Sequence, residues 1–189
     1  MTLAASGSND VPAAGAVSSP ATVSGVDAPW GHFVCECVGA DGEVKWTEEF
    51  DNVVTTAGKQ LHLDVMFGAT AKASWFVLLK GAGTAAAGDT LATHAGWTEL
   101  VPGTAYTGNR PAITFGAATV FSTTGAQVTN GTAVSFAILV NSTVIAGAGV
   151  ATVATGTSGT LYNIGDFASS RTMGAGDTLN VTIVLQQNP

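Results

Sequence analysis

Residues 177–185, DTLNVTIVL, alternate between apolar and polar side chains with a period of two. The apolar members are Leu179, Val181, Ile183 and Leu185, and the polar ones, continuing one residue further, are Asn180, Thr182 and Gln186. Successive side chains of a β-strand point to opposite faces of the sheet, so this stretch predicts a strand with one buried and one wetter face. It is the most regular pattern in the chain, and the rest of the sequence can be interpreted outward from it.

Similar short runs, rich in Val, Thr and Phe and bounded by Gly, Asn or Asp, recur along the chain. They are residues 32–38, 43–50, 73–80, 112–121, 133–140, 143–152 and 159–163. Of the 189 residues, 24 are Gly and only 10% are charged, so the residues that favour long helices are scarce. The pattern predicts an all-β sandwich or barrel of about nine strands.

Two of these runs form a predicted hairpin. HFVCECV (32–38) and EVKWTEEF (43–50) are joined by the turn sequence GADG at 39–42. Phe33, Cys35 and Cys37 share one face of the first strand, and Val44, Trp46 and Phe50 share one face of the second. The run ASWFVLLK (73–80) is apolar on both faces and is therefore expected in the middle of a sheet.

One helix is predicted, over residues 55–68. Thr55 or Thr56 can cap its N-terminus, and Gly68 supplies a C-terminal stop. An apolar stripe follows the helical period, with Ala57, Leu61 and Val65 widened by Leu63 or Met66.

The first 29 residues differ from the rest. Residues 1–29 are mostly Ala, Ser, Gly and Val, and Pro12, Pro20 and Pro29 interrupt them. They predict either a flexible or extended N-terminal arm that orders only when it docks on something, or a disordered tail with no role. A β-sandwich domain over 30–189 is expected to fold without them.

Charge and hydropathy exclude several classes of function. The chain has six Lys and Arg against thirteen Asp and Glu, a net charge of −7. It cannot neutralise the phosphates of a nucleic acid or an anionic membrane surface, so neither partner is expected. No apolar run approaches a membrane span, and the start has no secretory signal, so we expect synthesis and retention in a cytoplasm unless lysis releases the protein.

The two cysteines do not indicate a metal site. Cys35 and Cys37 lie two apart on a predicted strand, near the distance limit for a disulfide, and are expected to be buried free thiols. Structural zinc needs four ligands, and His32 is the only nearby addition. No metal and no cofactor is therefore predicted.

The stretch GDTLATHAGWTEL (88–100) is the best candidate for an active site in a chain otherwise poor in charge. Asp89 and His94 form a candidate pair, with Glu99 as an acid, and Glu48 is a second carboxylate that a glycosidase would require. No activated nucleophile accompanies them. The favoured interpretation is a structured loop anchored by Trp97, in a protein that is not an enzyme and has no catalytic residues.

Four stretches together resemble a known group of proteins. They are DNVVTTAGKQLHLDVMF (51–67), DTLATHAGWTEL (89–100), NRPAITFGAA (109–118) and GTLYNIGDFASSRTMGAGDTLNVTIVL (159–185). In this order, and covering roughly 30–186, they resemble small β-rich virion proteins of tailed bacteriophages, especially capsid decoration (cement) proteins. The resemblance implies a jelly-roll-like β-sandwich, located on the capsid exterior, that binds the major capsid protein and forms a dimer or trimer with itself.

Two alternatives remain open. A tail or head fibre or receptor-binding module would present a sugar-binding face, for which Trp30, Trp97 and Tyr106 are candidates. A hydrolase would join His94 to a carboxylate in a cleft.

Overall fold

The computed structural model describes residues 30–121 and 125–187. The predicted arm, residues 1–29, lies outside this range. In chain order the elements are β1 (Trp30–Val38), β2 (Val44–Val54), α1 (Thr56–Met66), β3 (Trp75–Gly83), β4 (Trp97–Glu99), β5 (Ala112–Ile113), β6 (Thr119–Phe121), β7 (Gly125–Thr129), β8 (Val134–Ala137), β9 (Thr143–Ala151), β10 (Leu161–Met173) and β11 (Thr178–Gln187). No helix of this part has the length and apolarity to span a membrane.

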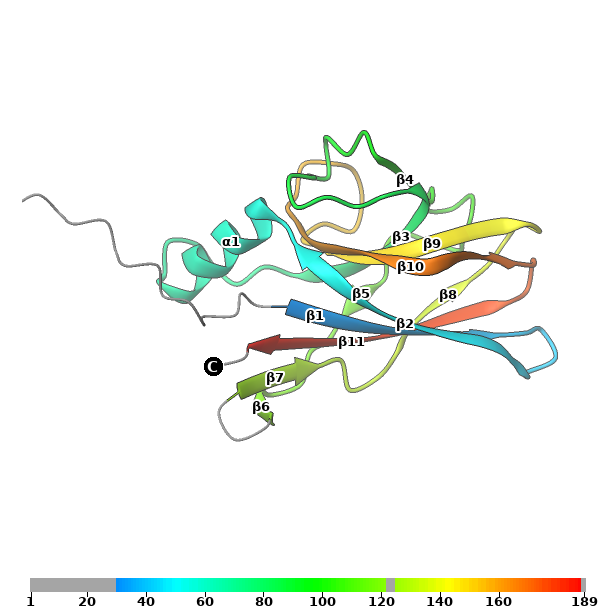
Figure 1. Cartoon of the computed structure of the whole chain (residues 1–189), viewed down its shortest axis with the longest axis horizontal. Coiled ribbons are helices and arrows are strands. Elements are labelled where there is room, and N and C mark those ends of the chain that lie inside the picture. The colour runs from blue at the N-terminus through cyan, green and yellow to red at the C-terminus, as the bar shows by residue number, and fades with distance from the viewer. Residues whose placement is uncertain (1–29, 122–124, 188–189) are drawn as a thin grey trace, which may run out of the picture.

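The strands form an antiparallel sheet that folds over itself into a sandwich. The order along it is β4-β3-β9-β10-β2-β1-β11-β7-β6, with β5 pairing with β3 and β8 with β11. In Figure 1, β3, β9 and β10 form one layer, and β1 and β11 form the other. The predicted all-β sandwich is thus confirmed, with eleven strands in place of about nine.

Strand β2 joins the two layers. Its residues up to Asp51 pair with β1, and Asn52, Val53 and Val54 pair with β10. The same strand therefore belongs to both sheets, and the chain enters α1 directly from the second one. The predicted hairpin with β1 is confirmed, and Gly42 at its turn has φ +86°, a conformation that glycine adopts without a steric penalty.

The core fills the space between the layers. The β11 pattern has the predicted phase, because Leu179, Val181 and Ile183 are completely buried. They pack in one cluster with residues of the opposite sheet, including Val77 and Ile145. At the end of β11 the pattern changes, since Leu185 is only half-buried while Gln186, predicted on the wetter face, is 8% exposed.

Strand β3 is buried on both faces. Val77 and Leu79 belong to the core between the sheets, whereas Leu78 packs on the other side with Leu91 and Trp97. The segment after β3 crosses over the outer face of the sheet and covers it. This cover explains why residues 73–80 are apolar without alternation.

Several strand predictions differ from the structure in extent. Residues 112–121 form two short strands, β5 and β6, because the chain crosses from one sheet to the other between them: Ala112 pairs with β3, and Phe115 bridges Asn130 beside β11. The run 159–163 continues as β10 to Met173, and β4 and β7 were not predicted. Gly, Ser and Asp in these segments are poor strand formers, and the pairing with β9, β2 and β11 overrides their preference.

The helix is confirmed almost as predicted. The Thr55 side chain accepts a hydrogen bond from the Gly58 N–H and donates to the Leu161 carbonyl, so the cap also ties the helix to β10. Gly58 is the only buried residue of α1. A Cβ atom there would stand 2.1 Å from the Tyr162 carbonyl oxygen, so only glycine permits this approach.

We expect Gly58→Ala to destabilise the fold by about 1–3 kcal/mol, the usual cost of overpacking a tight contact. In a free helix the same change stabilises by about 1 kcal/mol, so the sign of the effect tests the contact with β10. Urea unfolding measures it, with exposed Gln60→Ala as the control on the same helix. A stabilised Gly58→Ala variant would contradict the close approach.

Candidate functional site

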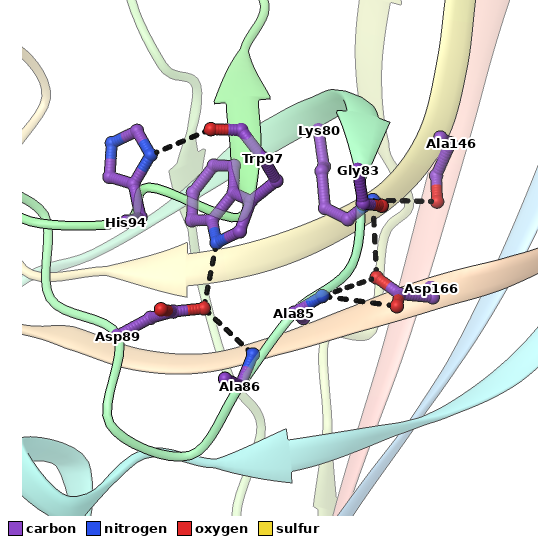
Figure 2. Close-up of polar contacts among 9 residues, drawn as sticks. All are labelled: Lys80, Gly83, Ala85, Ala86, Asp89, His94, Trp97, Ala146 and Asp166. Atoms are coloured by element: carbon purple, nitrogen blue, oxygen red, sulfur yellow. Dashed lines mark hydrogen bonds and ion pairs between the residues drawn. The ribbon is translucent and has the colours of Figure 1, made fainter.

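The loop between β3 and β4 is held by its own polar side chains (Figure 2). The Asp89 carboxylate accepts hydrogen bonds from the Trp97 indole Nε1 at 2.9 Å and from the Ala86 N–H at 2.7 Å. His94 stacks on the Trp97 ring with centroids 4.0 Å apart, and its Nδ1 lies 3.1 Å from the Trp97 carbonyl oxygen. Each polar group of this cluster thus stabilises the loop.

Trp97 anchors the loop in the outer core. Its side chain is 4% exposed and packs with Leu78, Leu91 and Ile164. The predicted role of this residue as an anchor is therefore confirmed. Its burial, with that of Tyr106, also removes two of the three aromatic candidates for a sugar-binding face.

A buried lysine lies beneath the loop. Lys80 is completely buried, and its Nζ lies 3.2 Å from a carboxylate oxygen of Asp166 and donates to the Gly83 carbonyl (Figure 2). Asp166, about one-third exposed, also accepts from the Ala85 N–H at 3.1 Å. A buried ammonium needs such a partner, so this pair determines where the loop leaves β3.

The candidate catalytic carboxylates are bound by arginines. Glu99 forms a two-point ion pair with Arg110, at 2.6 and 2.7 Å. Glu48 pairs with Arg171 at 2.7 Å and accepts from the Ala168 N–H. Each carboxylate is thus occupied by a different arginine, and the described contacts of His94 include neither.

The cysteines are buried free thiols, as predicted. Burial raises the pKa of Cys35 well above its ordinary value and that of Cys37 to about 11, with nearby Asp177 adding to the effect on Cys37. Thiolates are the reactive and metal-binding form, so both thiols are unreactive near neutral pH. His32 instead contacts Asp51 at 2.9 Å, and no cluster of metal-ligating side chains occurs in residues 30–121 and 125–187.

A different feature, an apolar groove, lies at the end of the sandwich where β11 finishes. We call it the end groove. It has a volume of about 850 Å³, and α1, the start of β3, the crossing segment 112–118, β7 and the end of β11 form its walls. Leu61, Val65, Trp75, Ile113 and Leu185 give it an apolar lining. In Figure 1, α1, β7 and the end of β11 lie on the left side of the molecule.

Helix α1 lies over the groove without being buried. The predicted stripe residues Leu61 and Val65 line the groove and are only half-buried. Met66, which also lines the groove, and Leu63, which does not, are each 54% exposed, and Phe67 directly after the helix is 78% exposed. Most helical stability in proteins comes from packing an apolar face, and this helix leaves part of its apolar surface exposed.

The wall also carries a polar group without a partner. The Gln186 side chain lines the groove and donates to Gln127 at 3.1 Å. Its Oε1 atom is buried and has no hydrogen-bond partner among the described residues. Buried acceptors are almost always satisfied, so an occupant with N–H donors would complete this wall.

The sequence contained one sign of the groove. The stripe 57-61-65 predicts an apolar face on the helix, but nothing in the pattern predicts that this face stays half open. The other walls come from segments separated by more than a hundred residues, which only the fold brings together.

Comparison with known proteins identifies no relative: no protein-family model, no curated protein and no solved structure matches this chain.

Trp97→Ala should cost about 3–5 kcal/mol of unfolding free energy, the range for truncating a buried large aromatic residue. It also leaves Asp89 without its indole donor. His94→Ala should cost less than about 1 kcal/mol, because the half-exposed ring loses only a stack and one hydrogen bond. Denaturant melts of both variants test this order, and the reverse order would show that His94, not Trp97, is the anchor.

Removing Asp166 and removing Lys80 should have unequal effects on the free energy of unfolding. Asp166→Ala leaves a buried ammonium without its carboxylate and should cost about 3 kcal/mol. Lys80→Met removes the buried charge and keeps its volume, leaving Asp166 partly solvated, so the cost should be near zero. If melts show that Lys80→Met is the more harmful change, the pair contributes net stability that desolvation does not offset.

Proposed function

We propose that the protein is a non-enzymatic structural component of a bacteriophage virion, a decoration (cement) protein that binds the major capsid protein on the exterior of the assembled head. Synthesis in the bacterial host cytoplasm would precede its attachment. The resemblance of the stretches 51–67, 89–100, 109–118 and 159–185 to phage virion proteins supports this origin.

The observation that carries the proposal is the apolar surface at one end of the sandwich. Met66 lines the end groove, and Met66, Leu63 and Phe67 are exposed on α1 or directly after it. Apolar groups gathered in this way on a small protein mark a surface for contact with another protein. Asp89 and His94 are meanwhile bonded within the β3–β4 loop, and Glu99 and Glu48 are paired with Arg110 and Arg171.

The body has the properties that a cement protein needs. A sheet packed on both faces provides a rigid platform, and the net charge of −7 keeps the unbound protein dispersed. The capsid-bound state would then combine the apolar end with contacts from residues 1–29, since an extended segment reaches surface that a compact body cannot.

Phe67→Glu should weaken binding to undecorated phage heads about tenfold or more, because it places a charge in the apolar contact. The matched control is Val44→Glu, which changes another exposed apolar residue, 55% accessible, at the hairpin end of β2. Both positions are exposed, so both variants should melt like the original chain. Co-sedimentation with purified shells measures the binding.

The full-length protein must bind in this assay for the proposal to survive. Deleting residues 1–29 should leave a folded body, since the strands from Trp30 onward pair with one another and enclose a hydrophobic core of their own. The deletion should weaken attachment further if the arm contributes contacts. Equal loss in Phe67→Glu and Val44→Glu would indicate a general charge effect and would contradict a role for the apolar end.

A further inference from the structure

We propose that the end groove is the binding site for the N-terminal segment of a second copy of this chain, centred on residues 11–26, so that neighbouring copies are linked by their arms. This pairing does not rest on the proposed function: it would hold in solution, without a capsid.

The groove has the properties of a site for an extended apolar peptide. Its volume, about 850 Å³, falls in the range of cavities that bury ligands. Among the described residues its lining has no carboxylate, and its cationic side chains are Lys72 and His62, the latter charged only when protonated. An apolar segment of low or negative charge therefore fits it better than a basic one.

Residues 11–26 match this chemistry. They contain only small or medium side chains, mainly Ala, Val, Ser, Thr and Gly, with Pro12 and Pro20. Read as an extended segment, Val17, Ala21 and Val23 fall on one face and Ser18, Thr22 and Ser24 on the other. The charged residues of 1–29 are Asp10 and Asp27, at the two borders of this segment, so acidic groups frame an apolar stretch.

Gln186 is the second observation that points to a peptide. Its Oε1 atom is a buried acceptor without a donor on the groove wall. A peptide in extended conformation offers backbone N–H groups at regular spacing, which is the donor that this oxygen needs. The half-buried stripe of α1, Leu61 and Val65, would become fully covered in the same step.

The described part of the chain begins close to the end groove. Trp30, the first residue of β1, pairs with Gln186, so the described chain begins beside a groove residue. Figure 1 shows this start of β1 and the end of β11 together at the α1 end of the sandwich. Two copies that face each other with these ends would each place residues 1–29 next to the other's groove, a reciprocal arrangement of the kind that domain swapping produces.

The sequence before β1 favours another copy over the chain's own groove. Pro29 has no N–H to continue the ladder, and it restricts Ala28 to extended conformations. A segment that continued in the line of β1 would lead away from its own groove. Twenty-nine residues extend to at most roughly 95 Å, several times the expected radius of a domain of this size.

Disulfide trapping between two different chains tests the inference. One full-length chain carries Val17→Cys in the segment, and a second, distinguishable by mass, carries Val65→Cys in the groove. Mixed under oxidising conditions, they should give a disulfide-linked heterodimer. The native cysteines should not interfere, because both are buried and burial raises their pKa. Gln60→Cys, exposed on α1 but outside the groove lining, is the matched control and should not cross-link.

Two outcomes would overturn the proposal. If Val17→Cys and Val65→Cys combined in one chain close an internal disulfide while the mixed chains do not join, the segment folds back on its own body. If neither combination reacts faster than the Gln60→Cys control, the groove does not bind this segment.

Self-association provides a second measurement. In sedimentation velocity over a range of concentrations, the full chain should associate, and Leu61→Asp should weaken the association about tenfold or more by placing a charge in the groove. Gln60→Asp adds the same charge on the adjacent helix position and should leave the association unchanged. Should Leu61→Asp fail to fold, Ala118→Asp on the exposed crossing segment places the charge on the opposite wall.

A chain that stays monomeric at all concentrations would overturn the pairing even if it bound capsids. A chain that associates through the groove but never binds shells would leave the pairing intact and remove the proposed function.

Discussion

The fold depends on the division of β2 between two sheets. Up to Asp51 the strand pairs with β1, and from Asn52 it pairs with β10, so one continuous backbone links both layers of the sandwich. This switch fixes the distance and crossing of the layers and therefore the space that the core must fill. It also delivers the chain to α1 at the end of the second sheet, where Thr55 caps the helix and binds the Leu161 carbonyl.

The outer face of β3 and the α1 end of the sandwich differ in how completely they are covered. The outer face of β3 is sealed by the loop that carries Asp89, His94 and Trp97, and the polar groups of this loop satisfy one another or the backbone. The α1 end is packed less completely. The helix approaches β10 closely at Gly58, its one buried residue, and its apolar stripe borders the end groove. The polar groups of the β3–β4 loop thus stabilise its structure, whereas the α1 end keeps part of its apolar surface uncovered.

The partners of the candidate catalytic side chains bear on function. His94, Glu99, Glu48 and Lys80 each have a separate structural partner: the Trp97 carbonyl, Arg110, Arg171 and Asp166, respectively. A binding protein needs only a rigid body and a complementary surface. The end groove, with the buried Gln186 acceptor and the start of β1 beside it, has the chemistry of a site for an extended chain, which is how the proposed linkage of copies arises.

The sequence by itself determined the all-β class, the β1–β2 hairpin, the helix with its Thr55 cap, the buried free cysteines and the anchoring role of Trp97. These features depend on side-chain period, turn residues and local hydrogen bonds, all of which involve residues close together in the sequence. Only the tertiary structure decided that β10 runs to Met173, that residues 112–121 split between two sheets, that Glu48 and Glu99 belong to different arginines, and that α1 stays half open. Those outcomes depend on strand pairing and on contacts between segments far apart in the chain, whose energies override local preference and leave no periodic signal in the sequence.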